Sequence, residues 1–296
     1  MIPYVRDISF EYGRVDQVSP LIRRVIADNP GPFTFTGTGT YIVGRGEVAV
    51  IDPGPAYDAH LEAILAAIPG ETVSHILLTH HHIDHSPLSP ALKARTGAPI
   101  HANPPAANTG HEEGEDSDAV TDVVLKGGEI IKGGDSKEGG WTLEAIATPG
   151  HTSNHICYAL KEEDACFTGD HIMGWSTTVI TPPDGDMAAY FASLDRIRER
   201  GFATLWPTHG PPILQADAFI GAYIAHRRDR EAQILGQLAA GPARINAMVP
   251  ILYAAVDPRL HPAAARSMLA HLLQLVGEGR VIASGEPGVD TEYRLA

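Results

Sequence analysis

Four side chains that can bind a metal ion fall within six positions of the segment THHHIDHS, residues 79–86. They are His80, His82, Asp84 and His85. Imidazole and carboxylate are ligands that zinc uses, and a catalytic zinc site has about three protein ligands and an open position. Side chains on an extended loop need not share one face, so two neighbouring metal ions could divide this set. A surface histidine cluster and an adventitious metal site are the alternatives.

Three more ligand-type residues each follow an expected strand and a short turn. His151 lies in TPGHT after a strand at 141–147, Asp170 lies in FTGDH after 164–168, and His209 lies in WPTHG after 203–206. Ligands at strand ends can converge on one edge of a sheet, where the sites of layered α/β folds are found. Asp52 has a similar place at the end of 47–52, and we expect it to hold the neighbouring loop by hydrogen bonds.

The elements that would position these residues alternate between strands and helices. Apolar periodicity predicts a hairpin at 40–44 and 47–52, strands at 75–80, 98–102, 121–125 and 155–160, and helices at 57–68 and 187–200. The segment 103–118 is rich in Pro, Gly and acidic residues and predicts an exposed loop. This pattern favours an α/β fold.

The character of the sequence changes near residue 222. Helices are expected at 223–239, 242–255 and 263–276, followed by strand-like segments at 279–284 and 291–296. Three helices followed by a hairpin is the order of a winged helix. We therefore predict a first domain over 1–222 and a winged-helix-like domain over 223–296.

Composition and charge narrow the function classes. The 296 residues carry 22 Lys and Arg against 36 Asp and Glu, a net charge of −14, which disfavours bulk nucleic acid and anionic membranes as partners. The sequence contains no run of about 18 apolar residues, so no membrane-spanning helix is predicted. The N-terminus shows no secretory signal, and two cysteines, Cys157 and Cys166, fit reduced thiols, so we expect a cytoplasmic protein.

Together these motifs resemble the metallo-β-lactamase superfamily. The resemblance rests on HxHxDH at 80–85, His151, Asp170, His209 and the early Asp52, and it covers roughly residues 35–210. It implies a four-layer αβ/βα sandwich of two mixed sheets with helices outside. It further implies that His80, His82 and His151 bind one metal, that Asp84, His85 and His209 bind a second, and that Asp170 bridges the two.

Two features distinguish branches of that superfamily. Exported β-lactamases with this loop lack a bridging aspartate, whereas Asp170 fits the glyoxalase II, lactonase and RNase-like branches. The segments 170–194 and 225–235 resemble the β-lactamase-like protein 2 group, which has a winged-helix tail and includes an animal endoribonuclease acting on single strands.

The predicted chemistry is metal-dependent hydrolysis. Two divalent cations, Zn²⁺ first with Fe²⁺ or Mn²⁺ also suited, can hold a hydroxide that attacks a carbonyl or phosphorus centre. Asp84 is the expected catalytic residue, because it would bind metal and orient that hydroxide. We expect a small ester, thioester or lactone as substrate, with cleavage of short single-stranded RNA as the alternative. A β-lactamase, a mono-iron persulfide dioxygenase and a DNA-binding winged helix are less favoured.

Several residues near these motifs have a structural and a functional interpretation. We expect His81 to face away from the site and His155 to be structural. A structural role is also favoured for His171, with hydrogen-bond donation behind Asp170 as the alternative. The cluster of Arg227, Arg228 and Arg230 is typical of a solvated helix face, and the alternative is that these side chains contact a phosphate. The tail would either pack on the first domain and wall its pocket, or mediate a homodimer.

Overall fold

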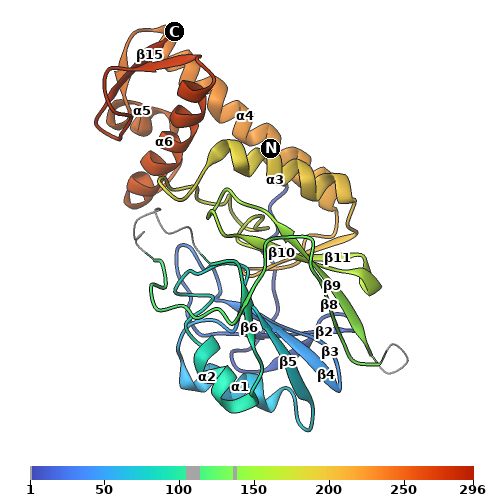
Figure 1. The fold of residues 1–296 in the computed structure, drawn as a ribbon. Helices are drawn as coiled ribbons and strands as arrows, with labels where there is room; N and C mark the ends of the chain where they lie inside the picture. The colour runs from blue at the N-terminus through green and yellow to red at the C-terminus, as the bar shows by residue number, and fades with distance from the viewer. Residues whose placement is uncertain (1, 105–113, 136–138) are drawn as a thin grey trace.

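The computed structural model describes residues 2–104, 114–135 and 139–296, and in this part of the chain two β-sheets lie face to face (Figure 1). The first contains, in spatial order, β1 (Val15–Gln17), β2 (Ile22–Ile26), β3 (Gly39–Arg45), β4 (Glu47–Ile51), β5 (Thr72–Leu77), β6 (Ile100–Ala102) and β7 (Val123–Val124). The second contains β12 (Thr204–Pro207), β11 (Ala165–Gly169), β10 (Ile156–Leu160), β9 (Trp141–Ala147) and β8 (Ile130–Gly133).

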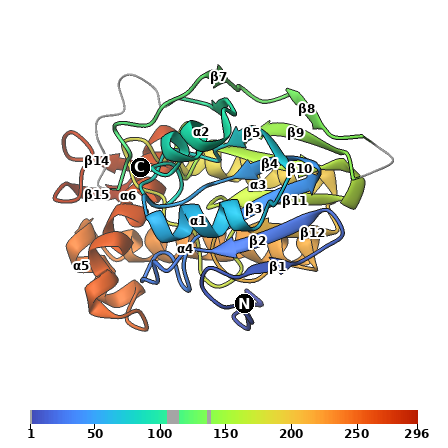
Figure 2. The same ribbon diagram turned by 90° about the horizontal axis from the view of Figure 1, so that it is seen from below.

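Helices cover the outer face of each sheet. Those on the first sheet are α1 (Asp58–Ala66) and α2 (Ser89–Thr96), and those on the second are α3 (Met187–Arg200) and the first half of α4 (Ala216–Ala239). Figure 2, viewed from the side of α1, shows this helix lying across the first sheet. This arrangement confirms the predicted four-layer αβ/βα sandwich.

The alternation of side chains along the strands separates the layers. Tyr41 of β3 packs between the two sheets with Phe167 of β11, whereas its neighbour Ile42 packs under α1 with Ile64. Successive strand residues point to opposite faces, so β3 is apolar on both faces and both faces are buried. Cys157 and Cys166 are buried free thiols in the layer under α3.

Four elements of this sandwich were not predicted: β1, β2, α2 and β8. The sequence of β2, IRRVI, hides its strand character because two arginines interrupt the apolar run, yet all five residues are buried. Arg23 is accommodated by an ion pair with Glu71 over 2.5 Å and by donating to the carbonyl of Ala67 over 2.8 Å. Most of the predicted loop at 103–118 lies outside the described residues.

The C-terminal region forms a second, smaller core. It comprises the second half of α4, β13 (Ala243–Arg244), α5 (Ile245–Leu252), a short 3₁₀ turn at Pro258–Leu260, α6 (His261–Gly277), β14 (Val281–Ala283) and β15 (Glu292–Leu295). Another short 3₁₀ turn, at Lys161–Glu163, lies in the first domain. Ile234, Met248 and Leu272 meet inside this core. The strands form a sheet of order β13-β15-β14, so a winged-helix unit follows the sandwich as predicted.

A single helix joins the two cores. α4 has 24 residues, begins seven residues before the expected helix start at 223, and crosses the expected boundary between 222 and 223 without a break (Figure 1). Phe219 belongs to the core of the sandwich, and Ile234 belongs to the C-terminal core. In the described part of the chain, no helix has both the length and the apolar character needed to cross a bilayer.

Candidate metal centre

Strand direction brings three of the candidate ligands to one edge of the second sheet. β9 and β11 are both antiparallel to β10, and β12 is parallel to β11, so β9, β11 and β12 run in the same direction. His151, Asp170 and His209 each lie shortly after the carboxyl end of one of these strands. The loop that carries the HxHxDH motif begins where β5 of the first sheet ends, at Leu77.

Asp52 fixes that loop, as expected from its place after β4. Its Oδ1 accepts the backbone N–H of Thr79 over 2.8 Å, and its Oδ2 accepts the hydroxyls of Thr79 and Thr208 over 2.8 and 2.9 Å. The same Oδ2 lies 2.9 Å from Nδ1 of His85. Asp52 is fully buried, and its four contacts connect the loop that carries the HxHxDH motif with Thr208, the neighbour of His209.

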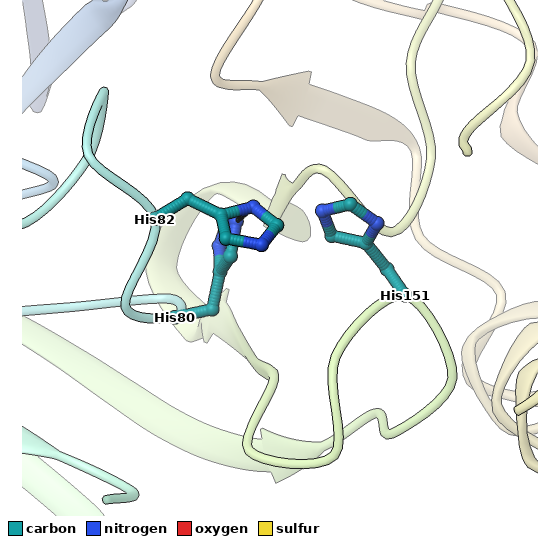
Figure 3. A group of neighbouring side chains, drawn as sticks. All are labelled: His80, His82 and His151. Carbon is teal, nitrogen blue, oxygen red and sulfur yellow. Dashed lines mark hydrogen bonds between the residues drawn. The ribbon is translucent and has the colours of Figure 1, made fainter. Parts of the chain in front are cut away.

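All seven predicted site residues converge. Their ligand atoms form three groups, each within 4.8 Å: His80 with His82 and His151, His80 with His85 and Asp170, and Asp84 with His85 and His209. The three rings of the first group face a common space, with His80 and His82 on one loop and His151 on another (Figure 3). The first and third groups are the two ligand sets that the resemblance implied.

The donor atoms at the centre fit a cation. Within the described residues, the Nε2 atoms of His85, His151 and His209 and Oδ1 of Asp170 are buried and make no hydrogen bond. The three nitrogens lie 3.1–3.9 Å from oxygens of Asp84 or Asp170, so the contacts among these atoms are ion pairs. Leaving a buried polar atom without a hydrogen bond costs about 1–3 kcal/mol. Four such atoms close together fit a positively charged group that would satisfy them. Imidazole nitrogens and carboxylate oxygens are the donors that Zn²⁺, Fe²⁺ and Mn²⁺ share, so the donor set does not select among these metals.

Backbone carbonyls orient two of the histidines from behind. Nδ1 of His151 donates to the carbonyl of Val179 over 2.7 Å, and Nδ1 of His209 donates to the carbonyl of Gly37 over 3.2 Å. Such bonds fix the ring orientation and leave Nε2 free for a metal ion. Neither partner was predicted, because a backbone carbonyl carries no residue-type signal. Thr79 and Thr208 were not predicted as partners of Asp52 either, although they lie within THHHIDHS and WPTHG.

Electrostatics divide the histidines into two kinds. Burial lowers the pKa of His82 to about 3 and that of His80 well below its usual range, so both rings are neutral at neutral pH. Burial also opposes protonation of His85, but Asp84 and Asp170 outweigh it and hold the pKa of His85 well above its usual range. The half of the site around Asp84 and Asp170 is thus the more negative one, and it stabilises positive charge.

Those two carboxylates remain ionised. Burial alone would raise the pKa of Asp84, but His85 and His209 hold it well below its ordinary value, and the same two rings do this for Asp170. Oδ2 of Asp84 lies 3.1 Å from Nε2 of His209, and Oδ1 of Asp170 lies 3.4 Å from the same atom. Both carboxylates can therefore bind a cation at neutral pH.

The neighbouring histidines behave differently from one another. His81 lies outside the ligand groups and accepts the amide N–H of Asn154 over 3.1 Å, so it faces away as predicted. His155 is structural: its Nδ1 pairs with the Thr148 hydroxyl over 2.8 Å, and its ring stacks on His80. His171 packs against Tyr190, and within the described residues neither of its ring nitrogens has a hydrogen-bond partner. The favoured structural role therefore holds, and the alternative that His171 donates a hydrogen bond into the site does not.

A pocket of about 820 Å³ opens over the site. His82, Asp84, His151 and Asp170 line one part of it, and Trp175 contributes a ring that stacks on Phe35. Residues of α4, α5–α6 and their connection complete it, namely His226, Arg227, Arg230, Tyr253, Val256, Leu260, Ala263, Ala264, Arg266 and Ser267. The tail thus walls the pocket, which was one of the two expectations for it.

Comparison with known families agrees with this geometry. The model of the metallo-beta-lactamase superfamily matches residues 34–209, and that of the beta-lactamase associated winged helix domain matches residues 245–289. The chain therefore belongs to the metallo-beta-lactamase superfamily. Membership of this superfamily supports a hydrolase.

Relatives and solved structures extend the match. An atrochrysone carboxyl ACP thioesterase of Claviceps purpurea is 33% identical, covering 78% of this chain and 68% of its own. A beta-lactamase-like protein 2 homolog of Caenorhabditis elegans is 31% identical over 75% of this chain and 72% of its own. The crystal structure of a beta-lactamase domain protein from Burkholderia ambifaria has a TM-score of 0.80 at 22% identity, covering 98% of this chain and 96% of its own, which shows the shared fold.

Proposed function

We propose that this chain is a hydrolase that uses two divalent cations, Zn²⁺ first among them, to cleave a small ester, thioester or lactone, with a thioester as the preferred substrate. The convergence of three ligand groups that share His80 and His85 carries the proposal. The thioesterase name of relatives such as the Claviceps purpurea protein supports the choice of a thioester.

The donor set divides naturally between two cations. His80, His82 and His151 would hold one, Asp84, His85 and His209 the other, and Asp170 would lie between them. Bound there, two divalent cations would activate water and polarise a carbonyl oxygen. Asp84 lines the pocket and remains ionised, so its second oxygen can accept a hydrogen bond from the attacking water and fix its direction.

The pocket suits a small acyl substrate. Apolar side chains such as Phe33, Met173 and Val256 line the same pocket as the two carboxylates. An acyl chain would bury its surface against them, while the scissile carbonyl reaches the cations. Exclusion of bulk water by this lining strengthens every electrostatic contact with the carbonyl.

The test is hydrolysis of an acyl thioester by zinc-loaded protein, with Asp84→Ala as the variant. We expect Asp84→Ala to lower kcat/KM at least about 100-fold while the thermal unfolding midpoint stays within a few degrees. Asp195→Ala, which removes an exposed carboxylate of α3, is the matched control and should keep full activity. Full activity of metal-loaded Asp84→Ala would refute the role of Asp84.

Metal analysis separates the parts of the proposal. Two equivalents per chain that are lost in parallel with activity support the dinuclear site, and one equivalent at full activity overturns it. Cleavage of single-stranded RNA but not of thioesters, esters or lactones would favour the alternative. That alternative is supported by the relative named as a beta-lactamase-like protein 2 homolog and by the arginines in the pocket.

A further inference from the structure

Two arginines of the connecting helix line the same pocket as the carboxylates of the metal site. Arg227 and Arg230 lie three positions apart on α4, so they share a face of the helix, and both contribute to the pocket wall. Arg228 lies on another face: it pairs with Glu231 over 2.8 Å and packs over the ring of Phe191 at 4.0 Å. The sequence cluster thus divides into two pocket residues and one residue that is already paired.

Arg227 is held in place but is not neutralised. Its side chain is buried, lies over the ring of Tyr190 at 5.3 Å and donates to the carbonyl of Thr178. Its Nε is buried and has no hydrogen-bond partner among the residues that the structure describes. These contacts involve a neutral ring and a neutral carbonyl, so the guanidinium brings an uncompensated positive charge to the pocket.

Arg230 is positioned in a similar way. Its guanidinium lies over the ring of Tyr253 at 4.0 Å, and its Nη1 donates to the side-chain oxygen of Gln233 and to the carbonyl of Leu252. All three partners are uncharged. Stacking on an aromatic ring fixes the planar fork of the guanidinium and leaves its outer N–H groups able to bind a planar or tetrahedral oxyanion.

The wall around these residues carries a positive field. Burial, together with the charges of Arg227 and Arg230, lowers the pKa of His226 to about 4. Burial likewise lowers the pKa of the nearby His271 to about 3, again with both arginines contributing. Among the residues that the structure describes, the acidic ones lining the pocket are Asp84 and Asp170, which face the metal site. Arg227 and Arg230 therefore bring positive charge to a lining whose described carboxylates both belong to the metal site.

Apolar side chains line the same pocket as the arginines and the carboxylates. They include Val256, Leu260 and Ala263 of the C-terminal domain and Phe33 and Ile83 of the sandwich. A ligand that fills this pocket would combine apolar surface with a group for the cations and an anion for the arginines. We propose that Arg227 and Arg230 form an anion subsite that selects substrates carrying an oxyanion, a phosphate or a carboxylate, in addition to the scissile acyl group.

This inference rests on the proposed hydrolysis of thioesters, and two sources could supply the anion. It could be a phosphate ester at the end of the thiol arm, or a carboxylate at the end of the acyl chain. The first is tested by comparing butyryl-phosphopantetheine with butyryl-pantetheine, and the second by comparing glutaryl-pantetheine with butyryl-pantetheine. All three substrates share the same thioester bond, so differences in kcat/KM report recognition of the anion.

We expect at least a 10-fold preference for one of the two anionic substrates, expressed mainly in KM because the subsite does not touch the reacting carbonyl. Arg230→Gln should bring that ratio close to 1, whereas Arg228→Gln should leave it unchanged. Arg230 is the better probe, because Arg227 also supports the fold through the carbonyl of Thr178. The preferred substrate identifies the source of the anion.

A binding measurement keeps the subsite testable if the thioester assignment fails. Isothermal titration of metal-loaded protein with S-propyl-phosphopantetheine, S-propyl-pantetheine and glutarate measures anion recognition without turnover. Tighter binding of an anionic ligand that is lost in Arg230→Gln supports the subsite even if no thioester is hydrolysed. Equal kcat/KM for neutral and anionic substrates, or a preference that survives in Arg230→Gln, overturns it.

Discussion

Oδ2 of Asp52 lies 2.9 Å from Nδ1 of His85, and this contact joins the first sheet to the metal site. Asp52 directly follows β4, whereas His85 ends the HxHxDH motif 33 positions later. Because Nδ1 faces Asp52, Nε2 of His85 must face Asp84 and Asp170, which lie 3.7 and 3.6 Å away. A residue that binds no metal thus determines which nitrogen of a ligand is presented.

Replacing Asp52 with Asn should weaken metal binding. The amide removes the negative charge and one of the acceptors that hold His85, Thr79 and Thr208 in place. We expect a 10- to 100-fold loss of zinc affinity, typical for partners behind a metal ligand, measured by competition with a chromogenic chelator. Asp195→Asn on the exposed face of α3 is the control. An affinity within twofold of the parent protein would contradict this role.

Gly169 should not tolerate a side chain. Its φ of +51° is left-handed, and an added Cβ would lie 2.6 Å from Nε2 of His155 and 2.8 Å from Cβ of Thr79. We expect Gly169→Ala to lose about 1–3 kcal/mol of stability and most activity, because Asp170 is the next residue. Gly236→Ala, in an open helical position of α4, should instead be neutral or stabilising. Denaturant unfolding of both variants provides the comparison.

Removal of metal should lower stability as well as activity. The buried Nε2 atoms and the carboxylates converge at the site, so cations bound there stabilise only the folded chain. At a metal concentration 100 times the dissociation constant, each site contributes about 2.7 kcal/mol. Dialysis against dipicolinate should lower the thermal midpoint by several degrees, and added Zn²⁺ should restore it. An unchanged midpoint after verified loss of metal would contradict the prediction.

His271 should make the protein sensitive to mild acid. Burial, then Arg227 and Arg230, lower the pKa of His271 to about 3, whereas the unfolded value is 6.5. Between these values the unfolded chain binds the extra proton, so stability falls as the pH falls below about 6.5. At pH 5 the loss from this residue is about 2 kcal/mol.

His271→Leu should remove that contribution, because neither ring nitrogen of His271 has a hydrogen-bond partner to lose. Urea unfolding of the parent and of His271→Leu at pH 7.5 and pH 5 tests this. Both proteins contain the same metal-site residues, so the contribution of that site to the pH dependence of the unfolding free energy cancels in the comparison. The prediction fails if the parent and the variant lose the same stability between the two pH values.

The candidate ligands could be found from the sequence because each follows a local pattern. Asp170 and His209 come directly after short apolar strands, and the HxHxDH segment places its ligands within six positions. The four-layer arrangement was an expectation from resemblance, and it is confirmed by the two sheets and their covering helices. The hydrogen-bond partners that orient His151 and His209 could not be predicted in this way, because the carbonyls of Val179 and Gly37 belong to other segments of the chain.

Residues whose role depends on distant packing were harder to predict. Arg23 lies inside a strand because Glu71 and the carbonyl of Ala67, more than 40 positions away, satisfy it. Arg227 belongs to a charged run that is typical of a solvated face, yet it is buried against Tyr190. In both cases the compensating partner determines the placement, and sequence spacing does not reveal that partner.

The unbroken helix between the two cores has a consequence for how such pockets can vary. An α-helix turns by about 100° per residue. One residue inserted into α4 ahead of His226 would therefore swing Arg227 and Arg230 away from the cavity and bring other side chains toward it. An insertion in a loop would leave the neighbouring elements in place. In this continuous helix, it would rotate the whole C-terminal unit relative to the sandwich. With the proposed anion subsite on α4, the length of this helix would therefore help to determine substrate selectivity.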